Sequence, residues 1–137
     1  MAGQRTTILV AGDDESNRTM LALLLEQAQC EVYLAADGHE ALDHMLKGGF
    51  DAVITDWDMP RVNGSEFLLI SQILWPGTPV IIVSAHSAPI AEGIARGAFA
   101  WLKKPYESHH LLQILHAALD ASAHRHWKQL ATTTFLK

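Results

Sequence analysis

Four short apolar runs in this chain each end on an acid, a hydroxyl or an amine, and this pattern limits the folds open to it. Brief, nearly continuous apolar runs are typical of strands buried on both faces of a parallel sheet. The carboxyl ends of such strands meet at one edge, where ligands of open α/β sheets bind. The polar residues that follow the runs are therefore expected to form one site. The runs and the polar segments after them are 8–11 before 12–15, 51–55 before 56–60, 80–83 before 84–85, and 99–102 before 103–105.

Helical patterns alternate with these strands. Apolar residues recur at helical spacing in the intervening segments, and a further strand is expected at residues 31–35. An alternation of strand and helix predicts an α/β fold, doubly wound about a parallel sheet with right-handed crossovers. Pro89 and Gly93 disfavour a regular helix between Ser84 and Lys104, so the fourth helix should be short or irregular. The other expected helices cover 15–29, 38–47, 64–74 and 107–126, and the last ten residues are expected to fray.

The composition fits one small domain. The chain has 137 residues, a single cysteine (Cys30) and no apolar run near the roughly 20 residues that span a bilayer. A lone cysteine excludes an intramolecular disulfide framework, and we expect a cytoplasmic protein that does not bind membranes. Residues 1–66 carry a net charge of −8 and residues 67–137 a net of +3. The acidic half suggests a cation site, whereas the second half is too weakly basic to indicate nucleic-acid binding.

The acids at the strand ends suggest a metal and a nucleophile. Two carboxylates about 4 Å apart repel by on the order of 4 kcal/mol at an effective dielectric near 20, and a divalent cation relieves this repulsion. Oxygen ligands without a cluster of cysteines or histidines favour Mg²⁺. Asp56 can then attack phosphorus and form an acyl phosphate. Lys104 can supply a positive charge and Ser84 a hydrogen-bond donor to the phosphoryl oxygens.

At these residues the sequence resembles a known family, the receiver domains of two-component response regulators, and among them the chemotaxis regulators. The resemblance spans about residues 6–121. It implies a flavodoxin-like sheet of five parallel strands in the order 2-1-3-4-5 with five helices, and transfer of a phosphoryl group from a histidine kinase. The segments that carry the resemblance are 12–15, 54–60 with Gly64, Ser84-Ala85, and Gly97-Ala98 before Lys104-Pro105.

The resemblance also assigns roles to residues. It implies that Asp56 is the phosphoacceptor, that Ser84 is the switch hydroxyl, that Lys104 is the site lysine and that Trp101 is the aromatic switch residue. Mg²⁺ would be held by the side chains of Asp13 and Asp56 and by the backbone carbonyl of Asp58, with Asp14 a further candidate. Asp58 and His86 flank the expected path of attacking water and are predicted to tune dephosphorylation, whereas Trp57 is expected to be an exposed lid.

Two positions depart from the pattern of the family. Gly12-Asp13 stands where two adjacent acids are usual, although a slip of one residue would make the pair Asp13 and Asp14. Without an acid at position 12 we expect weaker Mg²⁺ binding, and we expect Gly12→Asp to tighten it. The switch aromatic, Trp101, is bulkier than the usual Tyr or Phe.

The sequence leaves several functional alternatives open. The expected protein is a receiver domain at residues 1–123 with a helical extension or linker at 124–137, and not an enzyme beyond Mg²⁺-dependent self-phosphorylation and slow autodephosphorylation. Its partners would be a sensor histidine kinase or phosphotransfer protein, and a homodimer mate or downstream partner on the face of the fourth helix, fifth strand and fifth helix. The alternatives are a receiver-like module that works without phosphorylation and, far less favoured, a haloacid-dehalogenase-like phosphatase built on the Asp56-Trp57-Asp58 motif.

Overall fold

A computed structural model of the chain describes residues 5–85 and 97–135, with side chains up to residue 121. Five parallel strands form one sheet in the order β2-β1-β3-β4-β5. This confirms the predicted α/β fold, its parallel sheet and its strand order. The strands are β1 (Thr6–Ala11), β2 (Cys30–Ala35), β3 (Ala52–Asp56), β4 (Val80–Ser84) and β5 (Ala100–Lys103).

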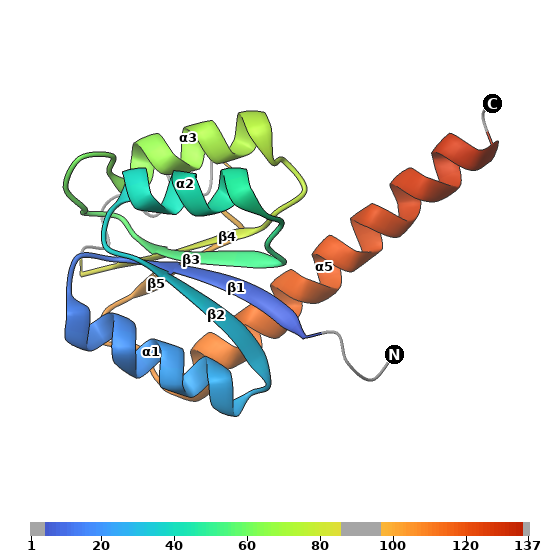
Figure 1. Cartoon of the computed structure of the whole chain (residues 1–137). Helices are drawn as coiled ribbons and strands as arrows, with labels where there is room; N and C mark the ends of the chain where they lie inside the picture. Colours follow the sequence, from blue (N-terminus) through green and yellow to red (C-terminus); the bar gives the residue numbers. More distant parts are fainter. Residues whose placement is uncertain (1–4, 86–96, 136–137) are drawn as a thin grey trace.

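Helices cover both faces of the sheet (Figure 1). Helices α2 and α3 lie on one face, and α1 and the first turns of α5 lie on the other. The helices are α1 (Glu15–Gln27), α2 (Gly38–Lys47), α3 (Gly64–Leu74) and α5 (Ser108–Phe135).

The apolar runs form the middle layer because each contributes side chains to both faces. Ile8 and Ile54 belong to the core cluster on the α1 and α5 side, whereas Leu9 and Val53 belong to the cluster on the α2 and α3 side. All four side chains are at most 1% exposed. Burial on both faces accounts for runs that are continuously apolar rather than alternating.

Side-chain caps fix where the helices begin, next to the carboxyl ends of the strands. Asp14 caps α1 by accepting a hydrogen bond from the Asn17 N–H, and Asn63 caps α3 in a capping box with Glu66. These caps hold the first turns of α1 and α3, the helices that follow β1 and β3. The acidic residues after β1 therefore serve local structure as well as any ligand.

Four helices occur in the described residues, where the sequence predicts five. The fourth predicted helix, with Pro89 and Gly93, falls within residues 86–96, which lie outside the described ranges.

The last helix is longer than predicted. It runs to Phe135, so the expected fraying of the last ten residues is wrong for 128–135. No glycine or proline interrupts residues 108–135, so nothing local ends the helix earlier. The division of the chain at residue 123 stays a prediction. Among the described residues, no helix combines the length and the apolar character needed to cross a bilayer.

Candidate phosphoacceptor site

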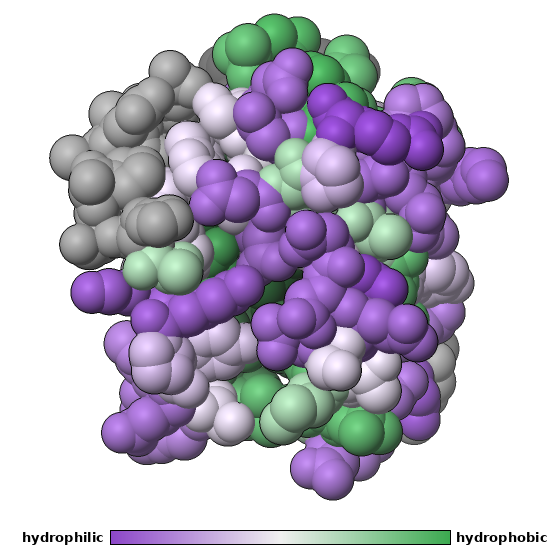
Figure 2. Space-filling view, turned by 90° about the vertical axis from the view of Figure 1, so that its left-hand side faces the viewer, coloured by the Kyte–Doolittle hydropathy of each residue, from purple (hydrophilic) through white to green (hydrophobic). Residues whose placement is uncertain are grey.

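The predicted site residues converge at the carboxyl edge of the sheet. Asp56 is the last residue of β3 and Ser84 the last residue of β4. Gly12 directly follows β1, and Lys104 directly follows β5. Figure 2 looks onto this end of the molecule, where hydrophilic side chains gather across the middle of the face. Parallel pairing of β1, β3, β4 and β5 is what brings residues so distant in sequence together.

Asp56 and Lys104 form an ion pair at the centre of this edge. Lys104 Nζ lies 2.8 Å from Asp56 Oδ1, and the two side chains are 31% and 15% exposed. Burial raises the pKa of the Asp56 carboxyl above its usual range. The Lys104 ammonium offsets part of this rise in pKa, whereas the charges of Asp13 and Asp14 add to it. Asp56 is thus a half-buried carboxylate balanced between one cation and two acids.

Gly12 makes room for the Asp56 carboxylate. A Cβ added at Gly12 would lie 2.5 Å from Asp56 Oδ2 and 3.1 Å from its Cγ. The first distance is too short for a real contact and the second is tight, so Asp56 occupies space that a side chain at position 12 would need. The loop is also fixed by Arg18, whose Nη1 donates a 2.6 Å hydrogen bond to the Gly12 carbonyl oxygen. Arg18 was not among the residues predicted from the sequence, although a residue one turn into α1 points back toward the end of β1.

The acids after β1 differ in what their side chains do. Asp14 Oδ1 accepts a 3.0 Å hydrogen bond from the Asn17 N–H, so one of its oxygens serves the helix cap. Asp13 and Asp14 are exposed, and both act on the pKa of Asp56. The described residues contain no group of three or more acids, cysteines or histidines arranged to hold a metal ion. A magnesium site here would therefore depend on few carboxylates, together with a carbonyl oxygen, water or phosphate.

Ser84 and Lys104 are tied together through the backbone. The Lys104 N–H donates a 2.8 Å hydrogen bond to the Ser84 carbonyl oxygen, and Ser84 pairs in register with Lys103. The Ser84 side chain is 3% exposed. Asp58 is exposed beyond the end of β3. His86, the other residue predicted to tune dephosphorylation, lies outside the described residues.

Trp57 does not behave as the predicted exposed lid. It is partly buried against the core cluster on the α2 and α3 side, and so is Trp101. The ring centroids of Trp57 and Trp101 are 4.9 Å apart, with an angle of 53° between the ring planes. This pair was not predicted from the sequence, because Trp57 follows β3, Trp101 lies within β5, and 44 positions separate them.

A hollow of about 500 Å³ opens beside the ion pair, between α1 and the start of α5. Asp14, Arg18, Asp56 and Lys104 contribute its charged groups. In the lower part of Figure 2 apolar side chains are visible between the hydrophilic ones. The apolar lining includes Val10, Leu21, Leu24, Ile54, Val83 and Tyr106. Burial raises the pKa of the Tyr106 hydroxyl, and the nearby Lys104 charge partly opposes this rise.

The fold and the site together define a class: a doubly wound α/β protein with a carboxylate and a lysine paired at the strand ends. Residues 8–116 match the sequence profile described as the response regulator receiver domain. The match covers more than half of the chain, and the chain therefore belongs to the receiver domain family of two-component systems.

Known relatives are similar over most of this chain. The sensory/regulatory protein RpfC of Xanthomonas campestris is 37% identical over 131 residues, which are 91% of this chain and 17% of that protein. The transcriptional regulatory protein ZraR of Klebsiella oxytoca is 35% identical over 121 residues, which are 87% of this chain and 27% of that protein. The chain thus spans less than a third of the length of these two relatives.

Solved structures have the same fold. The chemotaxis response regulator CheY4 of Vibrio cholerae is 34% identical, with a TM-score of 0.79 over 84% of this chain and 99% of that one. The response regulator TrrA of Thermotoga maritima, solved in complex with Mg²⁺ and BeF, is 25% identical, with a TM-score of 0.78 over 82% of this chain and 98% of that one.

Proposed function

We propose that this chain is a phosphoacceptor receiver that takes a phosphoryl group from a histidine kinase or a phosphotransfer protein onto Asp56. The observation that carries the proposal is the position of Asp56. Its half-buried carboxylate ends the central strand β3 and lies 2.8 Å from Lys104 Nζ. A nucleophile in that position has a cation beside the site where charge develops during phosphoryl transfer.

The transfer requires one bond to form and one to break. An oxygen of the Asp56 carboxylate bonds to phosphorus as the bond between phosphorus and the donor's imidazole nitrogen breaks. The imidazole keeps the electron pair of that bond, and Asp56 becomes an acyl phosphate. Lys104 then pairs with a phosphoryl oxygen in place of the free carboxylate. The Ser84 hydroxyl, at the end of the adjacent strand β4, donates a hydrogen bond to another.

The residues at this edge suit Mg²⁺. We assign its ligands to the carboxylates of Asp13 and Asp56 and to the backbone carbonyl of Asp58, with Asp14 contributing through the oxygen that does not cap α1. Mg²⁺ in proteins commonly uses one or two carboxylates and completes its octahedron with water and phosphate oxygens. When bound, the ion neutralises charge on the phosphoryl oxygens.

Turnover of the acyl phosphate is assigned to this domain's own residues. We assign the rate of autodephosphorylation to Asp58, which is exposed beyond the end of β3, and to His86, which follows Ser84 by two positions in the sequence. With a small-molecule phosphodonor and Mg²⁺ the domain phosphorylates itself and then slowly loses the label. We propose no further enzymatic activity.

The proposed partners follow from membership of the receiver family. A sensor kinase or phosphotransfer protein delivers the phosphoryl group in the cytoplasm. The response passes to a homodimer mate or downstream partner through the face of the fourth helix predicted from the sequence, β5 and α5, and this domain itself contacts neither nucleic acid nor membrane.

Labelling by acetyl phosphate in Mg²⁺, followed by intact-protein mass, tests the proposal. We expect a single phosphoryl group per chain, stable in acid and labile in base, that is absent in Asp56→Asn. Asp51→Asn is the matched control, because Asp51 precedes the same strand at its opposite end. Undiminished labelling of Asp56→Asn would refute the assignment.

The same experiment separates the alternative functions. A receiver-like module that works without phosphorylation takes up no label, and the missing acid at Gly12 is the observation that favours it. A phosphatase releases phosphate continuously instead of retaining one label per chain.

A further inference from the structure

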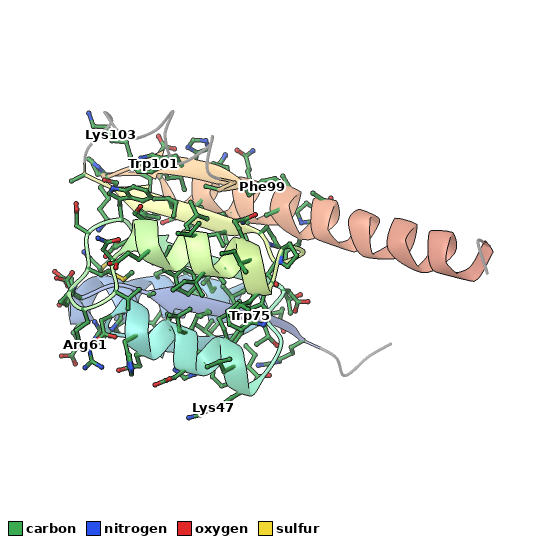
Figure 3. All side chains as sticks on the ribbon, turned by 90° about the horizontal axis from the view of Figure 1, so that it is seen from above. Lys47, Arg61, Trp75, Phe99, Trp101 and Lys103 are labelled. Atoms are coloured by element: carbon green, nitrogen blue, oxygen red, sulfur yellow. The ribbon has the colours of Figure 1, made fainter. Side chains whose placement is uncertain are left out.

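The contact between Trp57 and Trp101 joins the phosphoacceptor strand to β5. Trp57 directly follows Asp56, whereas Trp101 lies within β5, and strand β4 separates β3 from β5. The two indoles nevertheless meet, with ring centroids 4.9 Å apart. Figure 3 shows Trp101 near the end of the sheet at which α3 begins. A tilted arrangement at this distance is within the range of attractive aromatic pairs.

The backbone of Trp57 is fixed on two sides. Its N–H donates to the Val83 carbonyl at 3.1 Å, and its carbonyl accepts from the Gly64 N–H at 2.8 Å. Gly64 packs closely here, since an added Cβ would lie 2.6 Å from the Trp57 Cα. Trp57 therefore has little freedom to follow a movement of β5.

Two opposing contributions act on the free energy of the observed Trp101 conformation. Its Nε1 is buried and has no hydrogen-bond partner among the described residues. An unpaired buried donor disfavours the conformation that contains it, whereas the contact with Trp57 favours it. Opposing contributions of this kind keep two positions of a side chain close in free energy, so that a small change nearby can select between them.

The site is connected to Trp101 through β4 and β5. Ser84 pairs in register with Lys103, and the Lys104 N–H donates to the Ser84 carbonyl. A phosphoryl group on Asp56 draws the Ser84 hydroxyl and the Lys104 ammonium toward itself. Trp101 lies three residues before Lys104. Movement of Lys104 toward the phosphoryl group therefore shifts Trp101 relative to the fixed Trp57.

We propose that Trp57 and Trp101 form an indole latch that holds the unphosphorylated state and separates when Asp56 is phosphorylated. Trp57 is then a positioning residue for the switch, acting through Trp101. The inference rests on the proposed function of Asp56. It differs from rotation of a single aromatic residue because the partner indole comes from the phosphoacceptor strand.

The latch predicts an optical signal in the resting protein. Two indoles in contact give an exciton couplet in far-ultraviolet circular dichroism. We expect the couplet to disappear in Trp57→Phe and equally in Trp101→Phe. Trp75→Phe should retain it, because Trp75 packs against the same cluster but at the far end of α3 (Figure 3). A couplet that survives in either Trp57→Phe or Trp101→Phe would overturn the pairing.

Beryllofluoride with Mg²⁺, a mimic of the phosphoryl group, tests the release. Fluorine NMR measures the occupancy of Asp56 separately, and we expect the couplet to fall in proportion to that occupancy. An unchanged couplet with Asp56 occupied would overturn the latch and leave the proposed function intact. Failure of beryllofluoride to bind would overturn the proposed function and the latch with it, although the resting couplet would remain.

A second pair of variants measures the latch by affinity. Trp57→Leu keeps an apolar side chain and removes the ring contact. The unphosphorylated state is then less strongly favoured in free energy over the phosphorylated state. We expect beryllofluoride to bind about 2- to 10-fold more tightly than in the wild type. Trp75→Leu, a similar loss of ring area away from the site, should leave the affinity unchanged. Equal affinities in Trp57→Leu and the wild type would contradict the proposal.

Discussion

Replacing Lys104 with methionine removes the ammonium group that lies 2.8 Å from Asp56 Oδ1 while keeping most of the length of the side chain. Unit charges at this 2.8 Å separation attract by about 6 kcal/mol at an effective dielectric near 20, and by about 1.5 kcal/mol in bulk water. The two side chains are 31% and 15% exposed, so solvent weakens the attraction. Hydrogen bonds to charged groups contribute roughly 1.5–3 kcal/mol, and we expect a coupling free energy of about 2 kcal/mol.

A double-mutant cycle isolates this coupling. The wild type, Lys104→Met, Asp56→Asn and the double variant are unfolded in urea at pH 7 with a chelator present. Lys104→Met alone leaves the Asp56 charge partly buried near Asp13 and Asp14, and we expect it to be clearly destabilised. In the Asp56→Asn background the same substitution should cost much less, because no charge is left without a partner.

The coupling also has a defined pH dependence. Because burial raises the pKa of Asp56, the folded protein holds that proton more tightly than the unfolded chain does. The ionisation of Asp56 therefore costs stability as the pH rises from the ordinary carboxyl pKa through the raised one. Loss of Lys104 raises this pKa further and extends the window to higher pH. Below the ordinary carboxyl pKa, Asp56 is protonated in both states and the coupling should vanish.

Asp56→Asn removes this cost and should be more stable than the wild type at neutral pH, with the difference lost in acid. Additivity of the two substitutions within about 0.5 kcal/mol would refute the ion pair as a source of coupling. A coupling that persists unchanged in acid would refute its electrostatic origin.

Three further predictions concern the neighbours of Asp56. Gly12→Ala and Gly12→Asp both place a Cβ against Asp56 Oδ2, so both should shift the carboxylate, and Gly12→Asp, which also adds a ligand, should tighten Mg²⁺ binding measured by calorimetry more than Gly12→Ala does. Ser84→Ala should slow labelling by acetyl phosphate by roughly tenfold through loss of a donor to the phosphoryl oxygens, and Ser84→Thr should restore most of the rate. Arg18→Met should destabilise the fold by about 1–2 kcal/mol in urea, because it removes the 2.6 Å hydrogen bond to the Gly12 carbonyl.

The sheet was accessible from the sequence because burial on both faces leaves a simple pattern. Runs such as 8–11 and 80–83 are continuously apolar, and the residue after each run marks a strand end. Parallel pairing then places these ends at one edge of the sheet, and the length of the lysine side chain lets Lys104 reach Asp56 past the end of β4. The length of α5 was not accessible in this way, because residues 128–135 contain no apolar repeat that predicts a helix.

The contact between Trp57 and Trp101 could not be read from the sequence for a geometric reason. Their strands are not neighbours, so no pairing rule relates their positions, and the contact depends on the reach of two large rings across β4. A smaller residue at either position would not span that distance. The large size of both side chains is the one feature of the sequence that could have indicated the contact.

Gly12 affects the site in two ways, one indicated by the sequence and the other seen in the structure. As a departure from a pair of acids, it indicates a missing metal ligand. In the fold, its lack of a Cβ leaves the space in which the Asp56 carboxylate lies beside Lys104. The two effects act on the same carboxylate: a missing acid weakens the hold on a cation, and the vacant space favours the ion pair that competes with that cation. Because Gly12→Ala closes the space without adding a ligand, comparing it with Gly12→Asp separates these contributions to the Mg²⁺ affinity.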